Sequence, residues 1–230
     1  MMLPTTLTTM EAPMPLDQQL LDPSFRAAYL RDLVLSRYDE GDACCAMGAV
    51  SLLAGHACRS DVPEGVSVVL GALVRCLNDN ADDRPRQELL PLLPRLLNSA
   101  DEAADRQREA VLRRAIEDVV LRGMQHRLTA PLRNRIGAAR TRRQVAAAYR
   151  AAARHLLHPV GLALHAEAAM ALAAAALEED PSLAALLACQ ALGSELRCNP
   201  DAVWGPALDL LDALIELDGC EQREAEIQAA

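Results

Sequence analysis

The sequence contains no lysine, and all 23 of its basic residues are arginines. Aromatic residues are almost as scarce, with only Phe25, Tyr29, Tyr38, Tyr149 and Trp204. Sheets favour β-branched and aromatic residues, whereas the abundant Ala and Leu favour helices, so this composition predicts an all-α protein. The lack of lysine fits a GC-rich genome. Selection against lysine, as in proteins that avoid lysine-directed tagging in a eukaryotic host, is the alternative.

Several patterns of known chemistry are also missing. The sequence has no G-x-S-x-G, no phosphate-binding loop, no dinucleotide fingerprint and no C-x-x-C. Cys44, Cys45, His56 and Cys58 are of the types that bind zinc, but adjacent cysteines on a helix point about 100° apart. The oxygen-rich segment 78–83 lacks the glycine and glutamate of a calcium-binding EF-hand loop. We therefore expect neither a metal nor a cofactor.

No targeting segment is recognisable in the sequence. Its first basic residue is Arg26, and Met1 to Pro15 has no continuous apolar stretch, which excludes signal and transit peptides. The sequence has seven cysteines, an odd number, and most of them lie among Ala and Leu. We expect them to be reduced core residues of a cytoplasmic protein. The arginine-free segment 159–177 contains His165 and Glu167, so it predicts a buried helix and no membrane contact.

Capping residues and prolines divide the chain into helices. We expect a tail over 1–22, ordered structure from Asp22-Pro23-Ser24, and one all-α domain over 23–230 of about nine or ten helices. Short motifs recur about 120 residues apart. This recurrence suggests that the domain consists of two pseudo-repeated halves, 23–118 and 119–230. The clearest predicted helices are 43–54 (capped by Asp42, stopped at Gly55), 64–77 (opened by Asp61 and Pro63), 84–97 (broken by Pro91 and Pro94), 101–125, one capped by Thr141, 181–196 and 200–217 (stopped at Gly219).

The first half contains a group of short motifs: Cys44-Cys45-Ala46-Met47-Gly48-Ala49, Asn78-Asp79, Arg86-Gln87 and Leu92-Leu93-Pro94-Arg95-Leu96. In these motifs the segment 44–97 resembles a family of uncharacterised bacterial helical proteins. The resemblance implies a bacterial helical protein, and it implies no particular activity.

Charge is distributed very unevenly along the chain. The 48 residues between Asp118 and Glu167 contain no carboxylate and nine arginines, a charge of +9. The rest of the chain has 14 arginines against 32 acidic residues, which leaves the whole at −9. The nine arginines are Arg122, Arg127, Arg133, Arg135, Arg140, Arg142, Arg143, Arg150 and Arg154. The protein is therefore electrically polarised.

The helix that begins after Thr141 should carry part of this charge on one side. On a helical wheel Arg143, Arg150 and Arg154 fall within about 40° of one another. The opposite side is apolar and is expected to be buried, so the arginines should face solvent or an acidic partner. The candidate partner- or phosphate-binding residues are Arg135, Arg140, Arg142, Arg143, Arg150 and Arg154.

Three explanations compete for the basic segment. It could pair within the chain with the acidic helices 101–118 or 207–226, through residues such as Asp209, Asp212 and Glu216. It could bind an acidic protein partner or a second copy of the chain. It could also bind nucleic acid, although the acidic remainder of the chain and the lack of aromatics oppose this.

We predict a non-enzymatic interaction protein, such as an adaptor, a chaperone-like protein or a regulatory module. A nucleic-acid-binding regulator using the segment 122–154 is the first alternative. The second is an enzyme with a buried polar site between helices, involving His165 and Glu167. These two residues form the H-x-E of zinc deaminases, but Cys189 and Cys198 do not supply the P-C-x-x-C that such enzymes require. A satisfied polar pair of His165 and Glu167 is therefore expected.

Overall fold

The computed structural model describes residues 22, 29, 32–38, 43–157 and 162–229. Within these residues it contains nine α-helices and no β-strand, which confirms the predicted all-α fold. None of the described helices is long and apolar enough to cross a bilayer. Apart from Asp22, the predicted tail 1–22 lies outside the described residues, as do Pro23, Ser24, Asp42 and Pro159.

The helices follow one another with short connections. In chain order they are α3 (Ala46–Leu53), α4 (Val68–Asn80), α5 (Asp83–Arg86), the 3-10 helices η1 (Gln87–Leu89) and η2 (Leu93–Leu96), α6 (Glu102–Met124), η3 (Gln125–Arg127), α7 (Ala130–Ala138), α8 (Arg142–Leu156), α9 (Ala163–Ala175), α10 (Pro181–Cys198) and α11 (Pro200–Ala229).

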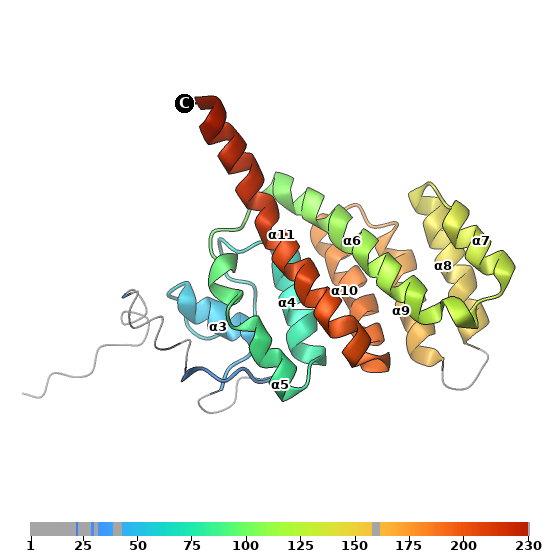
Figure 1. Ribbon diagram of the computed structural model, residues 1–230, viewed down its shortest axis with the longest axis horizontal. Coiled ribbons are helices and arrows are strands. Elements are labelled where there is room, and N and C mark those ends of the chain that lie inside the picture. Colours follow the sequence, from blue (N-terminus) through green and yellow to red (C-terminus); the bar gives the residue numbers. More distant parts are fainter. Residues whose placement is uncertain (1–21, 23–28, 30–31, 39–42, 158–161, 230) are drawn as a thin grey trace, which may run out of the picture.

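Helix α10 lies at the centre of the bundle. It packs between α4 and α9, and α8 packs on the far side of α9, so these four helices form a row. Helices α6 and α11 cross the row and contact each other as well as α10 (Figure 1). Helix α7 packs on α8 at the outer end of the row. The division into halves 23–118 and 119–230 stays a prediction, and residue 118 lies inside α6.

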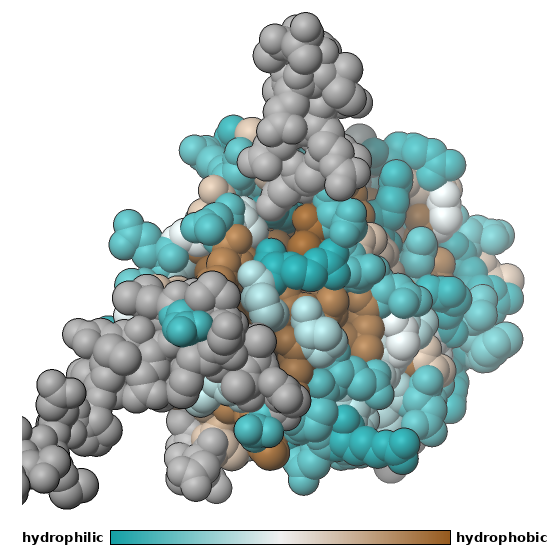
Figure 2. All heavy atoms as spheres, turned by 60° about the vertical axis from the view of Figure 1, so that its left-hand side comes forward, coloured by the Kyte–Doolittle hydropathy of each residue, from teal (hydrophilic) through white to brown (hydrophobic). Residues whose placement is uncertain are grey.

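Small apolar residues make this close packing of helices possible. The buried side of α10 consists mainly of small residues, namely four Ala with Cys189, Gly193 and Ser194. All eight residues of α3 are buried, because this helix is apolar on every side. On the face seen from the side of α3, hydrophobic residues gather in the middle of the described surface and hydrophilic residues surround them (Figure 2).

The predicted starts of three helices are confirmed, and each start has an N-cap side chain. The carboxylate of Asp101 accepts hydrogen bonds from the backbone amides of Ala103 and Ala104 at the start of α6. Thr141 and Gln144 form a capping box at the start of α8. Asp180 caps α10 in the same way as Asp101 caps α6, and it precedes the proline at the first helical position.

Other boundaries differ from the prediction. Cys45, and not Asp42, caps α3, through its sulfur and the amide of Gly48. Ser67, and not Asp61, caps α4, so this helix begins four residues later than expected. Ser67 is buried and also bonds to Asp105 of α6, a tertiary contact that the local sequence does not reveal. The turn predicted at Gly55 is confirmed, because its φ is +82°.

The two prolines in 84–97 have the predicted effect, whereas Gly219 does not. The chain from Asp83 to Leu96 consists of the short helix α5 and the 3-10 helices η1 and η2, and Pro91 and Pro94 prevent a continuous α-helix. Gly219 was expected to end the last helix, but α11 continues to Ala229. A glycine in a helix is unfavourable by only about 1 kcal/mol relative to Ala, so it need not stop the helix.

The buried side of α6 is not the one that the sequence pattern favours. Val111, Ala115 and Val119 recur every four residues and support the predicted helix 101–125, but these residues are exposed or half-buried. The buried stripe is displaced by one residue and consists of Leu112, Ile116, Val120 and Met124. The buried stripe also includes the polar residues Asp105, Arg108 and Glu109. Because these residues are polar, the spacing of apolar residues in the sequence does not reveal the stripe.

A buried ion pair connects α6 to three other parts of the chain. The guanidinium of Arg108 is fully buried and lies 2.7 Å from Asp105 Oδ1. It also donates to the carbonyl of Ser99 at 2.8 Å and to that of Leu214 in α11 at 3.4 Å. Asp105 in turn accepts a hydrogen bond from the hydroxyl of Ser67, the cap of α4. The pair therefore determines how α4, α6 and α11 lie against one another.

The displaced stripe on α6 can be tested with two adjacent residues. Leu112→Ala should lower the free energy of unfolding by about 2–5 kcal/mol, because it leaves a cavity in the core. Val111→Ala should change it by less than about 0.5 kcal/mol, because Val111 is largely exposed. Urea denaturation followed by circular dichroism measures both. If Val111→Ala is the more harmful substitution, the orientation of α6 described above is wrong.

The ion pair leads to a second stability prediction. Asp105→Ala should lower the free energy of unfolding by about 3–5 kcal/mol, since it leaves the charge of Arg108 buried without its carboxylate. Asp118→Ala removes an exposed carboxylate from the same helix and serves as the control, with an expected change below about 0.5 kcal/mol. Similar stabilities of the two variants in urea denaturation would contradict the prediction.

Candidate functional site

The six candidate arginines lie on the outer end of the bundle, at α7 and α8. Arg135 is on α7, Arg140 is in the connection, and Arg142, Arg143, Arg150 and Arg154 are on α8. All six are exposed. The side of α8 predicted to be apolar contains the buried residues Ala148, Tyr149, Ala152 and Leu156, together with the half-buried Val145. We call the surface formed by the six arginines the α7–α8 face.

The structure brings only some of these arginines together. Arg135 and Arg143 line one shallow recess between α7 and α8, of about 360 Å³. Its other lining residues are Ala138, Ala139, Gln144 and Ala147. Arg142 turns away and donates to the carbonyl of Glu178, and Arg140 donates to carbonyls of its own loop. Arg150 and Arg154 extend the basic surface along α8 beyond the recess, on the side of Arg143.

Pairing of the basic segment with the acidic helices is not seen in the described part of the chain. None of the nine arginines between Asp118 and Glu167 forms an ion pair with a described carboxylate. Asp212 and Glu216, two of the expected partners, instead bind Arg95 of η2, Glu216 at 2.7 Å. Among the described residues, no carboxylate therefore forms an ion pair with the arginines of the α7–α8 face, and these arginines are exposed to solvent.

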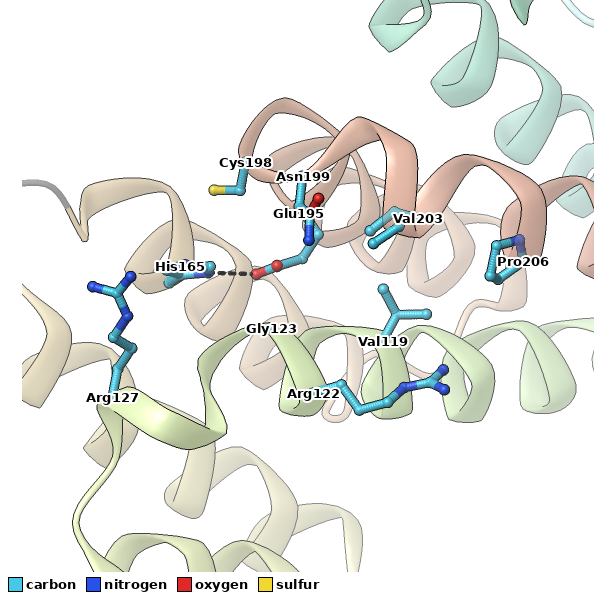
Figure 3. A pocket seen from close by; sticks show the side chains of 11 residues that line it. Val119, Arg122, Gly123, Arg127, His165, Glu195, Cys198, Asn199, Val203 and Pro206 are labelled. Atoms are coloured by element: carbon cyan, nitrogen blue, oxygen red, sulfur yellow. Dashed lines mark hydrogen bonds and ion pairs between the residues drawn. The ribbon is translucent and has the colours of Figure 1, made fainter.

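A second site is a pocket where α6, α9, α10 and α11 meet. Its volume is about 390 Å³. Helix α6 contributes Val119, Arg122 and Gly123, η3 contributes Arg127, and α9 contributes His165. The remaining lining residues, from α10, α11 and the connection between them, are Glu195, Cys198, Asn199, Ala202, Val203 and Pro206 (Figure 3).

His165 and Glu195 form an ion pair at the wall of this pocket. Nδ1 of His165 lies 2.8 Å from Oε1 of Glu195, and the side chains are 12% and 2% exposed. The expected pair of His165 and Glu167 is wrong. Glu167 is two residues further along α9, about 200° around the helix, and is 57% exposed with Arg197 at 3.6 Å.

Gly123 of α6 makes room for the carboxylate of Glu195. A Cβ atom at position 123 would lie 2.2 Å from Oε2 of Glu195, closer than any real contact. Burial raises the pKa of the Glu195 carboxyl above its ordinary value, and the hydrogen bond and charge of His165 oppose this increase. The close packing of α6 thus forces the carboxylate against His165.

Cys198 lies in the same pocket, next to the end of α10. Partial desolvation where the thiol faces the pocket, and then the charge of Glu195, raises the pKa of the Cys198 thiol, so it stays protonated near neutral pH and is a poor nucleophile. The arrangement therefore lacks the activated thiolate that a Cys-His hydrolase requires. Nothing else in the pocket offers an activated nucleophile.

The other cysteines are only partly as expected. Cys44, Cys45 and Cys189 are buried in the core, as predicted, whereas Cys58 and Cys198 are exposed and Cys76 is half-buried. None of the six forms a disulfide bond among the described residues, and Cys220 has no described side chain. Cys44, Cys45, His56 and Cys58 are not brought together as a group that could hold a metal ion. No cluster of three metal-binding side chains occurs among the described residues.

No protein-family model, curated protein or solved structure matches this chain significantly. The geometry of the two sites therefore has to carry any functional argument.

The sequence pattern missed Glu195 and Arg127. Glu195 is the only carboxylate in α10, where it stands among Ala, Leu and Gly. An isolated acid on an apolar helix is a signal that could have directed attention to it, because such a group needs a partner when buried. Arg127 was included only as one of the nine arginines of the basic segment, and its place in the pocket depends on the turn η3 after α6.

The raised pKa of Glu195 predicts a pH dependence of stability. Because ionisation is harder in the folded protein than in the unfolded chain, Glu195 lowers the free energy of unfolding as the pH rises through its raised pKa. Glu195→Gln should remove this loss, so the variant should gain stability relative to the parent between the ordinary carboxyl pKa and neutral pH. The exposed Glu167→Gln is the control. Urea midpoints at a series of pH values measure this, and parallel curves for parent and Glu195→Gln would contradict it.

Proposed function

We propose that this protein is a non-enzymatic interaction protein of the cytoplasm, which binds an acidic, amphipathic segment of a partner protein at the α7–α8 face. The observation that carries the proposal is the set of exposed arginines with no carboxylate partner in the described part of the chain. An acidic partner would supply the missing charge. Arginine is well suited to this because its planar guanidinium binds carboxylates in a bidentate manner.

The recess between α7 and α8 adds an apolar contact to this charge. Three alanines line it together with Arg135, Arg143 and Gln144. An apolar centre with a charged rim is the usual anatomy of a protein interface. Helix α7 leaves this side open, since none of its residues is buried and it packs mainly on α8. A partner helix with an apolar stripe and acidic flanks would fit this arrangement.

The same features argue against the nucleic-acid alternative. Tyr149 is the only aromatic residue in the basic segment, and it is 2% exposed, so no aromatic ring is available to stack on bases. The acidic remainder of the molecule, with 32 carboxylate side chains, would also repel a long polyanion.

The proposal predicts selective binding of amphipathic acidic peptides. A helical peptide of about 18 residues with a leucine stripe and glutamates elsewhere should bind at least about tenfold more tightly than polyglutamate of equal charge. Arg135→Ala/Arg143→Ala should weaken this binding at least about tenfold, because it removes both arginines of the recess. Isothermal titration calorimetry measures the dissociation constants.

A matched variant controls for the loss of charge. Arg75→Ala/Arg84→Ala removes two exposed arginines outside the basic segment and should leave peptide binding unchanged. Equal binding of both peptides, or none, would overturn the proposal. Tighter binding of a duplex DNA than of the peptide, steeply weakened by salt and lost in Arg143→Ala/Arg150→Ala/Arg154→Ala, would replace it with the nucleic-acid alternative.

A further inference from the structure

The central helix α10 has one side that no described helix covers. Helices α6 and α11 cross the same side of the row, in front of α10 in Figure 1, and α4 and α9 flank α10 within the row. Between residues 183 and 196 the exposed positions of α10 are Leu183, Leu186 and Gln190, which fall within about 60° of one another on a helical wheel. This narrow stripe therefore points away from α6 and α11.

Helix α9 shows the same pattern beside α10. It packs between α8 and α10, and α6 contacts it from the side that α6 also covers on α10. Its exposed residues Glu167, Met170 and Ala174 again fall within about 60° of one another, and Leu177 follows them in the turn after the helix. Because α9 and α10 pack on each other, the two exposed stripes lie side by side.

The two stripes are largely apolar. Four of the nine large hydrophobic side chains that are exposed in the described part of the chain belong to them, namely Met170, Leu177, Leu183 and Leu186, which are 40 to 47% exposed. We call the surface formed by these four residues the α9–α10 patch. Met170 lies five residues before the end of α9 and Leu186 five residues after the start of α10, so they are at the same level of this antiparallel pair. Exposed apolar residues that cluster in this way mark an interaction surface, whereas single ones do not.

One end of the α9–α10 patch is acidic. Glu178, Glu179 and Asp180 lie in the turn between the two helices, and none of their carboxylates forms an ion pair with a described basic residue. Arg142 reaches this turn from α8, but it donates to the carbonyl of Glu178 and not to a carboxylate. The hydrogen bonds that Asp180 accepts from Ser182 lower the pKa of its carboxyl, so the carboxyl is ionised at neutral pH.

The charges at the opposite end of the α9–α10 patch are balanced. There Arg197 of α10 lies 3.6 Å from a carboxylate oxygen of Glu167 on α9. A partner that covers the apolar residues therefore needs positive charge only where it meets the turn. An amphipathic helix with an apolar stripe and basic residues at one end has this distribution.

We propose that the α9–α10 patch binds an amphipathic helix of a partner protein, whose apolar stripe covers Met170, Leu183 and Leu186 and whose basic end lies against the turn 178–180. At about 1.5 Å per residue, the patch is about 10 Å long from Met170 to Leu177, so two to three turns of a partner helix cover it. This surface is separate from the α7–α8 face and takes a partner of the opposite charge. The two proposals can therefore fail independently.

Two peptides that differ only in charge test the acidic end of the patch. Each is a helix of about 14 residues with a leucine stripe and glutamines elsewhere, and it ends in three arginines or in three glutamates. The arginine peptide should bind at least about tenfold more tightly, because its charges meet the carboxylates of the turn. Isothermal titration calorimetry with the full chain gives both dissociation constants.

Substitutions in the apolar part test where the arginine peptide binds. Met170→Gln/Leu186→Gln should weaken its binding at least about tenfold, because it removes the apolar centre of the patch. Val34→Gln/Val111→Gln changes two exposed valines outside the patch and should leave the binding unchanged. Circular dichroism checks that both variants are folded.

Substitutions in the turn test the charge. Glu178→Gln/Glu179→Gln should reduce the preference for the arginine peptide to less than about threefold, whereas Glu102→Gln/Asp118→Asn, which removes two exposed carboxylates of α6, should preserve it. Equal affinity for the two peptides, or full affinity in Met170→Gln/Leu186→Gln, would overturn the proposal. Dimerisation in sedimentation velocity that Met170→Gln/Leu186→Gln abolishes would overturn it as well, and would assign the patch to a second copy of the chain.

Discussion

The buried guanidinium of Arg108 is the interaction on which the arrangement of the helices depends. A charge without exposure to water is tolerated only where other groups solvate it, and removal of one partner typically destabilises a protein by about 3–5 kcal/mol. Here the partners come from α6 itself, from the loop that precedes it and from α11. Helix α6 can therefore neither rotate nor slide by one residue without breaking the contacts of Arg108 to Ser99 and Leu214. Its orientation is fixed more firmly than apolar packing alone would fix it.

Both candidate sites follow from that orientation. With Leu112, Ile116 and Val120 turned to the core, Val119 and Gly123 face the meeting point of α10 and α11. Gly123 then meets Glu195, which is pressed against His165. Several carboxylates of α6 and α11 are meanwhile paired within the bundle, with Arg108, Arg113 and Arg95 among their partners. The basic end at α7 and α8 is left without them.

The sequence was sufficient to predict what depends on local interactions. Asp101, Thr141 and Asp180 cap helices because each side chain bonds to amides two or three residues away. The positive segment could be predicted for a similar reason, since charge is a sum over neighbouring residues. The buried side of α6 could not be predicted in this way, because Asp105, Arg108 and Glu109 belong to it and a periodicity count treats charged residues as exposed. Their burial is made possible by partners distant in sequence, such as Leu214.

The pocket shows the same limit in another form. Glu167 is only two residues from His165 in the sequence, so proximity in sequence predicts that the two side chains pair. Two residues correspond to about 200° of helical rotation, however, and Glu167 therefore faces solvent. The actual partner of His165, Glu195, is thirty residues away on another helix. What the local sequence does reveal is that Glu195 is the only acid on an apolar helix. An isolated acidic residue of this kind indicates that a partner for its carboxylate must exist. It does not identify the partner, because the partner residue depends on which helix packs against α10. That choice is made by the whole bundle, and ultimately by the buried charge on α6.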